Sequence, residues 1–412
     1  MQAIVRTWIN DSALAQEGRR RISRASSQMP VMNRLRERFA LERPFKGLKI
    51  LLALPPEAPT ACLGKALQAG GAELVLAGGG PHPNNSGICA ALAADGITGI
   101  TDFGTEPETV KERLIRAMET GPHLIVDDRG ELVAMLQAER PDLLAGIRGG
   151  AARTRAGLPR LMKLEKEQRL PFPMIVIDDA PGMDALAPRF GTVSSVWDDL
   201  LQAAAFDAAG KTVVVAGYGL RGKAIAMQAR ALGAHVVVAE LDPPKAVEAF
   251  MDGCQVMRLQ EAALIGDLLI SATGAPDTIG GKHCFLMKDG VLLCQTGLPG
   301  GEINTNELAD IAISRGTVRK NLERYELIDG RKIYLYDARP PANETSVDDD
   351  CTETTDMRLA LLALSLHYMN GHYDRLGNEV MKAPYALDEE IAVLKLQSLG
   401  LNIDEAADRW TG

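Results

Sequence analysis

One stretch, Val213–Ala224, constrains the fold more than any other part of the 412-residue chain. Its first residues, Val213–Ala216, predict a buried strand, and the pattern Gly-x-Gly-x-x-Gly follows at Gly217, Gly219 and Gly222. In dinucleotide-binding folds the first glycine permits a tight turn and the second lets a pyrophosphate approach the backbone. The third lets the following helix pack against the strand. The stretch therefore predicts a strand, a phosphate-binding loop and a helix.

A second strand and an acidic residue complete the pattern. Residues His235–Ala239 predict a strand that ends at Glu240, eighteen positions after Gly222. A carboxylate there accepts hydrogen bonds from a ribose diol and repels a 2′-phosphate, so the pattern indicates NAD rather than NADP. Leu220 and Arg221, between the last two glycines, belong to the same predicted cofactor site. A purely structural glycine turn is the alternative.

Composition narrows the class of protein further. The formal net charge of −9 argues against a nucleic-acid surface. The six cysteines contain no Cys-x-x-Cys pair, so the sequence predicts neither a disulfide framework nor a metal site. We see no signal-peptide core and no apolar run of membrane-spanning length, and expect a cytoplasmic protein that binds no membrane.

Strand and helix patterns alternate along most of the chain, which is typical of an α/β fold with a mostly parallel sheet. The predicted strands lie at Leu48–Leu54, Glu73–Ala77, Leu124–Asp127, Met174–Asp178, Leu268–Ala272, Val291–Cys294 and Ile311–Ser314. Near the end of the chain, a long helix is predicted from about Thr354 to Tyr368, and the tail from Leu387 to Trp410 also has a helical pattern.

The chain resembles the S-adenosylhomocysteine hydrolase family along nearly its whole length. The segments that carry the resemblance include Asp127–Leu132, Gly146–Gly149, Val215–Gly219, Glu240–Pro243 and Met287–Asp289. Members of this family use tightly bound NAD to oxidise the ribose 3′-hydroxyl of their substrate. The resulting ketone acidifies the neighbouring 4′ C–H, homocysteine is eliminated, water adds, and the reduced cofactor restores the alcohol.

The resemblance implies a Rossmann NAD-binding domain inserted into a flavodoxin-like α/β substrate domain. The expected boundaries are 1–190 and 344–386 for the two parts of the substrate domain, 191–343 for the NAD domain and 387–412 for a helical tail. Further cofactor contacts are expected at Thr154, Thr273, Gly274 and Asn343. A homo-oligomer, either a dimer or a tetramer, is implied as well.

Several residues on which the family's chemistry depends are different here. Pro55 replaces a histidine that contacts the ribose, Arg153 replaces a glutamate that grips it, and Met183 replaces a lysine that shuttles protons. Leu298 replaces a second histidine. Since each general acid or base contributes roughly 10²–10⁴ in rate, these losses argue against ordinary hydrolysis of adenosylhomocysteine.

Two arginines of the altered segment suggest a different substrate. Guanidinium groups bind carboxylates and phosphates through paired hydrogen bonds, so Arg153 and Arg155 predict an anionic small molecule. The alternative is that both are solvated, or pair with Asp127, Asp128 or Glu131.

Three residues are candidates for proton transfer. Asp128 matches an aspartate of the family's site, and Glu57 follows the first strand; either carboxylate can act as a base if partly buried. His82 lies in a loop that borders the substrate cleft in the family. The alternatives are that Glu57 caps a helix and that His82 is an ordinary surface histidine.

Three functions are consistent with these patterns. The first is a divergent NAD-dependent enzyme that oxidises, or transiently oxidises, an anionic small molecule rather than the family's nucleoside substrate. The second is a non-catalytic NAD-binding paralogue that regulates a partner. The third is an adenosylhomocysteinase that works through substitute residues. The sequence patterns favour the first of these over the others.

Overall fold

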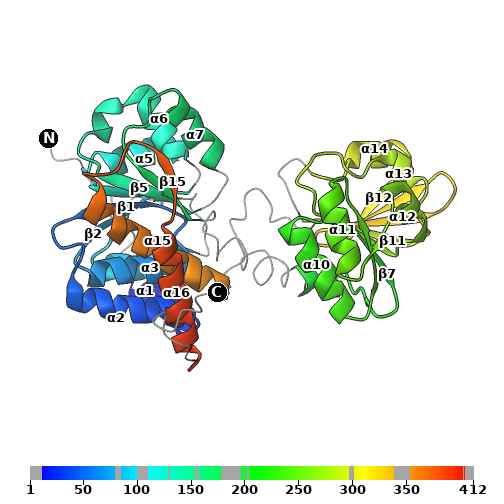
Figure 1. Ribbon diagram of the computed structural model, residues 1–412, viewed down its shortest axis with the longest axis horizontal. Coiled ribbons are helices and arrows are strands. Elements are labelled where there is room, and N and C mark those ends of the chain that lie inside the picture. The colour runs from blue at the N-terminus through cyan, green and yellow to red at the C-terminus, as the bar shows by residue number, and fades with distance from the viewer. Residues whose placement is uncertain are drawn as a thin grey trace, which may run out of the picture. The chain divides into compact units, whose positions relative to one another are not determined.

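The computed structural model describes residues 12–78, 85–99, 110–128, 130–153, 157–177, 196–198, 200–201, 204–296, 301–337, 353–401 and 403. The chain divides into two compact units, each with its own sheet (Figure 1). Unit 1 comprises Met1–Asp184 and Val347–Gly412, and unit 2 comprises Ala185–Ser346. The predicted boundaries near residues 190 and 343 both lie outside the described residues.

Unit 1 is built on a seven-stranded sheet in the order β15-β6-β5-β4-β1-β2-β3, and every pairing in it is parallel. The strands are β1 (Lys49–Ala53), β2 (Glu73–Leu76), β3 (Thr98–Gly99), β4 (Leu124–Asp127), β5 (Gly149–Ala152), β6 (Met174–Val176) and β15 (Val380–Lys382). The predictions of β1, β2, β4 and β6 agree with the structure. The sequence patterns do not predict β3, β5 and β15.

Strand β5 has no recognisable strand pattern because its sequence is Gly-Gly-Ala-Ala, which has low strand propensity. Its small residues are explained by close packing. A Cβ atom on Gly149 would lie 2.4 Å from the sulfur of Met369, on the helix that crosses this strand, and 3.0 Å from the Pro173 carbonyl oxygen. Glycine in a strand interior often marks such a close approach.

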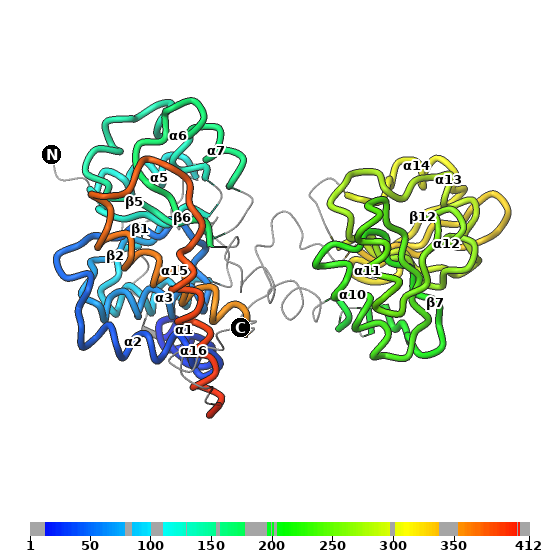
Figure 2. The backbone as a smooth tube through the Cα atoms, viewed as in Figure 1, coloured from blue at the N-terminus to red at the C-terminus, as the bar shows by residue number. Residues whose placement is uncertain are grey.

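Helices cover both faces of this sheet. Figures 1 and 2 show α5–α7 on one side and α1–α3 with α15 on the other. The helices of unit 1 are α1 (Ser12–Ser27), α2 (Pro30–Glu42), α3 (Ala58–Ala69), α4 (Ser86–Ala94), α5 (Val110–Met118), α6 (Glu131–Glu139), α7 (Leu158–Lys166), α15 (Glu353–His372) and α16 (Tyr385–Ser398), with a 3₁₀ helix at Pro141–Leu144. None of the helices described is long and apolar enough to cross a membrane.

A buried carboxylate joins the two chain segments that make up unit 1. Asp356, in the first turn of α15, has no exposed surface and accepts hydrogen bonds from the backbone N–H groups of Val31 and Met32, each at 2.9 Å. These N–H groups belong to the first turn of α2, where they have no partner within the helix. Burial raises the pKa of Asp356 above its ordinary value, and the two N–H groups only partly offset that effect.

Unit 2 is an eight-stranded sheet in the order β12-β13-β14-β11-β10-β7-β8-β9. Its strands are β7 (Thr212–Ala216), β8 (His235–Ala239), β9 (Gln255–Val256), β10 (Leu268–Ser271), β11 (Val291–Gln295), β12 (Ala312–Arg319), β13 (Leu322–Leu327) and β14 (Lys332–Asp337). The six strands from β14 to β9 are parallel. Their order matches the doubly wound Rossmann arrangement, whose switch point lies between β7 and β10.

The helices of unit 2 are α10 (Leu220–Ala231), α11 (Pro243–Met251), α12 (Leu259–Ile265), α13 (Gly281–Cys284) and α14 (Thr305–Asp310). Alternate residues of β7 enter different cores: Val213 and Val215 pack in one, and Val214 in the other. Both faces of the strand are therefore buried, which explains its continuous apolar sequence.

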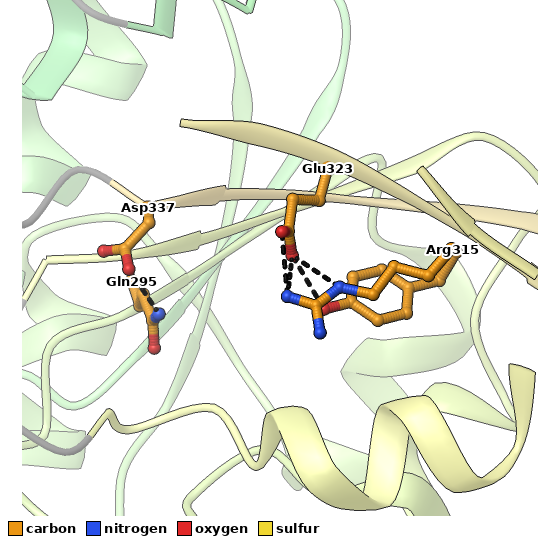
Figure 3. Close-up of polar contacts among 5 residues, drawn as sticks. Gln295, Arg315, Glu323 and Asp337 are labelled. Atoms are coloured by element: carbon orange, nitrogen blue, oxygen red, sulfur yellow. Dashed lines mark hydrogen bonds and ion pairs between the residues drawn. The ribbon is translucent and has the colours of Figure 1, made fainter. Parts of the chain in front are cut away.

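The antiparallel strands β12 and β13 extend the sheet beyond its parallel part. Arg315 of β12 forms a paired salt bridge with Glu323 of β13, with a shortest N–O distance of 2.8 Å (Figure 3). Gln295 at the end of β11 donates to Asp337 at the end of β14, at 3.1 Å. The sequence patterns predict only the start of β12, because the alternating charges of β13 obscure its apolar positions.

We expect Asp356→Ala to lower the free energy of unfolding by about 1–3 kcal/mol, because two buried N–H groups of α2 lose their acceptor. Urea unfolding followed by far-ultraviolet circular dichroism measures the change. Asp142→Ala is the control, since Asp142 forms an exposed salt bridge with Arg140. Equal losses in the two variants would contradict the structural role of Asp356.

Candidate cofactor and substrate sites

The three glycines of the unit 2 loop are required for three different reasons. Gly217 has a φ of +93°, and a Cβ atom there would lie 2.8 Å from the Ala272 carbonyl oxygen. A Cβ atom on Gly222 would lie 1.9 Å from the carbonyl oxygen of Gly217, so α10 packs directly on the turn. A Cβ atom on Gly219 would meet no atom of the described residues within 4 Å, apart from its chain neighbours and its own helix. The space beside Gly219 is therefore open to a ligand, as expected for the second glycine of a dinucleotide loop.

Helix α10 begins at Leu220, directly after Gly219. No side chain of the described residues caps its N-terminus, so the first N–H groups are available to an anion. From the same turn, the guanidinium of Arg221 donates to the Thr296 carbonyl oxygen at 2.9 Å, reaching the end of β11. Backbone N–H groups and a cation thus lie at the edge of the sheet where a pyrophosphate binds in this fold.

Glu240, at the end of β8, is already oriented by the backbone. Its Oε2 atom accepts from the Tyr218 N–H at 2.6 Å, and its Oε1 atom accepts from the N–H groups of Leu241 and Asp242 at 2.6 and 2.9 Å. Burial raises the pKa of Glu240, but these N–H groups outweigh it, so the pKa lies below its ordinary value. The carboxylate is therefore charged at neutral pH, the state that accepts hydrogen bonds from a ribose diol.

The side chain of Tyr218 anchors the loop to the neighbouring helix. Its hydroxyl donates to Asp252 at 2.9 Å, directly after α11, and Lys223 forms a salt bridge with the same carboxylate at 2.9 Å. Tyr218 is 1% exposed. The loop is therefore held on two sides, by Glu240 through the backbone and by Asp252 through the side chain.

The loop after β10 lies against the glycine turn. A Cβ atom on Gly217 would lie 2.9 Å from the Cα atom of Thr273. Thr273 and the following Gly274, with a φ of +71°, are thus placed beside the predicted cofactor loop. Thr273 is held by Glu302, a buried residue that no sequence motif singles out. One acid between apolar residues is a weak signal, because its partner lies almost thirty positions away.

In unit 1, three of the predicted residues follow strands that are neighbours in the sheet. Arg153, Asp128 and Glu57 come after β5, β4 and β1, respectively, and these strands lie side by side. Since the strands are parallel, the three residues lie at the carboxyl edge, where ligands bind in open α/β sheets. The structure therefore brings them to one edge of unit 1.

Arg153 and Asp128 form a paired salt bridge. The Nε and Nη2 atoms of Arg153 donate to the two carboxylate oxygens of Asp128, at 3.0 and 3.2 Å. Their side chains are 25% and 16% exposed. Pairing with Asp128 is one of the alternatives that the sequence leaves open for Arg153. The neighbouring Asp127 has a different role, since it accepts from the Val133 N–H at 3.0 Å in the first turn of α6.

Glu57 is half-buried and occupies the residue before α3. Its backbone carbonyl accepts from the Ala61 N–H at 2.9 Å, but its side chain makes no capping hydrogen bond to the helix among the described residues. Four other predicted residues, His82, Thr154, Arg155 and Asn343, lie outside the described residues.

We expect Gly219→Ala and Gly222→Ala to fail in different ways. The new methyl group of Gly219→Ala enters open space, so thermal stability without NAD should be unchanged while NAD affinity falls about tenfold or more. Gly222→Ala should lower the melting temperature itself, because its methyl group collides with the Gly217 carbonyl. Differential scanning calorimetry and isothermal titration calorimetry measure the two effects. Normal NAD binding by Gly219→Ala would contradict the assignment.

We also expect Glu240→Ala to weaken NAD binding by about tenfold to a hundredfold, since hydrogen bonds to a charged group contribute about 1.5–3 kcal/mol. The affinity for NADP should fall less than that for NAD, or rise, because Glu240→Ala removes the carboxylate that repels the 2′-phosphate. Titration with both dinucleotides tests this, with Glu261→Ala, an exposed position on α12, as the control. An unchanged ratio of the two affinities would refute the role of Glu240.

Comparison with known proteins finds matches in both units. The family model of the S-adenosyl-L-homocysteine hydrolase NAD-binding domain matches residues 188–339, and that of S-adenosyl-L-homocysteine hydrolase matches residues 6–142. The chain is 38% identical over 400 residues to the adenosylhomocysteinase of Pyrococcus abyssi, covering 97% of this chain and 95% of that protein. It is 39% identical over 397 residues to the S-inosyl-L-homocysteine hydrolase of Methanocaldococcus jannaschii, covering 96% and 95%.

Among solved structures, the chain is similar to the NAD-bound 3-phosphoglycerate dehydrogenase of Entamoeba histolytica, with a TM-score of 0.45, 12% identity and coverage of 80% and 96% of the two chains. The sequence matches over both units are much stronger. The chain belongs to the S-adenosyl-L-homocysteine hydrolase family, and its cofactor is NAD.

Proposed function

We propose that this protein uses NAD to cleave the thioether bond between a nucleoside ribose and homocysteine. The observation that carries the proposal is a complete dinucleotide loop within a chain that aligns, over nearly its full length, with enzymes named adenosylhomocysteinase and S-inosyl-L-homocysteine hydrolase. These relatives favour hydrolysis over the altered anionic substrate that the sequence patterns favour. Because their names differ in the base, adenine and hypoxanthine substrates are both candidates.

Unit 2 supplies the oxidising part of this function. Bound NAD provides a reversible acceptor for the hydride of a ribose carbon. The open backbone at Gly219 and the first N–H groups of α10 would hold its pyrophosphate, and Arg221 would add positive charge from the same turn. Glu240, held by three backbone N–H groups, would accept hydrogen bonds from the ribose hydroxyls of the adenosine half.

Unit 1 supplies the proton-handling part. Pro55 and Met183 stand where the family resemblance implies a histidine and a lysine, and neither side chain can transfer a proton. We therefore assign proton transfer to the carboxylates at the carboxyl edge, Asp128 and Glu57. The salt bridge with Arg153 fixes the orientation of Asp128. An oriented carboxylate within reach of the substrate is what general-base catalysis requires.

A second candidate function is oxidation of an anionic small molecule. The feature that favours it is Arg153, which stands where the resemblance implies a glutamate. An anionic substrate would have to replace the Asp128 carboxylate that the guanidinium binds in this structure. Arginine binds carboxylate and phosphate groups well, whereas a nucleoside ribose carries no charge for it to bind.

One experiment separates these functions. The purified, NAD-loaded protein is incubated with S-adenosylhomocysteine or S-inosylhomocysteine, and released nucleoside and homocysteine are measured by mass spectrometry. We expect homocysteine release from one of them, and slower release from Gly219→Ala when NAD is below saturation. Asp128→Asn should slow the release by about 10²–10⁴, the usual contribution of a general base.

If the NAD-loaded protein leaves both thioethers intact, the proposal is wrong. The second candidate is then supported if carboxylate or phosphate metabolites reduce the bound cofactor. The absorbance of the reduced nicotinamide measures this reduction. Bound NAD with no reduction by any of them supports a non-catalytic NAD-binding paralogue.

A further inference from the structure

Glu302 is a buried acid in unit 2 to which neither the sequence patterns nor the proposed function gives a role. The residue is 1% exposed and lies in the segment between β11 and α14. Burying a carboxylate is costly unless hydrogen bonds compensate, so its partners should reveal its purpose. All of the partners described for its carboxylate lie at the end of β10 or directly after it.

Three donors converge on one oxygen of this carboxylate. The Oε2 atom accepts from the Thr273 N–H at 2.8 Å, from the Thr273 hydroxyl at 3.0 Å and from the Ser271 hydroxyl. The backbone of Glu302 holds the far end of the same loop, because its carbonyl accepts from the Ile279 N–H at 3.1 Å. One residue therefore fixes both the beginning and the end of the loop after β10.

This loop is in contact with the glycine turn of the cofactor site. The backbone of Ala272 and Thr273 lies so close to Gly217 that a single added methyl group there would collide with both. Ala272 and Thr273 thus line the glycine turn on the side of β10. The loop also lies on the opposite side of β7 from β8, which is followed by Glu240. In this fold the two halves of a dinucleotide bind on opposite sides of the switch point.

We propose that Glu302 is a positioning residue for NAD: its carboxylate holds the loop after β10 against Gly217 and orients Thr273 toward the nicotinamide half of the cofactor. The negative charge is necessary because hydrogen bonds to an ionised acceptor are roughly twice as strong as neutral ones. A glutamine at this position has nearly the same shape, but offers only a neutral oxygen to three converging donors.

The test compares Glu302→Gln with the wild type, both stripped of cofactor, by titration calorimetry with NAD and with AMP. AMP carries only the adenine half, so it reports on Gly219 and Glu240 and not on the loop after β10. We expect the dissociation constant for NAD to rise by about tenfold or more, as expected for the loss of a charge-assisted hydrogen bond. The dissociation constant for AMP should change less than about twofold.

Glu307→Gln is the matched control. Glu307 is also a carboxylate of unit 2 that accepts from a backbone N–H group, that of Gly281 at the start of α13, at 2.7 Å, but it has no described contact with Thr273. It should bind both ligands as the wild type does. Ser271→Ala removes one donor and leaves the carboxylate in place. It should weaken NAD binding in the same direction but by less, and it serves as the test if Glu302→Gln does not fold.

A double-mutant cycle with Thr273→Val shows whether the effect passes through Thr273. This substitution should weaken NAD binding in the wild type and have a smaller effect when Glu302→Gln is already present. Equal losses for NAD and AMP, additive losses in the cycle, or unchanged NAD binding would each overturn the proposal. No substrate is used, so these results do not depend on whether the protein hydrolyses a thioether.

Discussion

The carbonyl oxygen of Gly217 lies where helix α10 comes closest to the turn after β7, and there is room for nothing larger than glycine at Gly222. This contact sets the distance between strand and helix, and with it the position of the helix N-terminus. The loop after β10 packs on the other side of the same turn. Glu240, which follows β8, accepts a hydrogen bond from the Tyr218 N–H group of this turn. A single tight backbone turn thus fixes the positions of the three elements that would surround a dinucleotide.

Much of unit 2 can be predicted because its signals are local. An apolar strand, three spaced glycines and an acid after the next strand all lie within thirty residues of one another. Strands such as β5 cannot be predicted this way, because its glycines reflect close packing against residues far away in the chain, such as Met369 of α15 beside Gly149. Glu302 cannot be predicted from the sequence for a related reason. Its hydrogen-bond partners, Ser271 and Thr273, precede it by about thirty positions.

In unit 1, the sequence identifies candidate site residues but not the residues with which they pair. The sequence identifies Arg153 and Asp128 separately, and offers pairing with Asp127, Asp128 or Glu131 as alternatives to binding an anion. Only the parallel pairing of β5 with β4 places Arg153 beside Asp128, while Asp127 turns toward the first turn of α6. Whether Arg153 pairs with Asp127 or with Asp128 depends on the direction in which each of these adjacent side chains points. The neighbouring residues in the sequence do not determine those directions.

The hydrogen bonds from Val31 and Met32 to Asp356 span 325 and 324 residues of chain, and the whole of unit 2 lies between their ends. During synthesis, the start of α2 must therefore wait for its acceptor while an entire nucleotide-binding unit is made. At the usual rate of translation this delay is roughly 16 to 65 s. Through that interval the nascent first segment of unit 1 lacks α15, whose apolar residues are buried in this unit, and β15, the edge strand of its sheet. Unit 2, whose strands and helices are contiguous in the sequence, can complete its folding before unit 1, whose two segments precede and follow it in the chain.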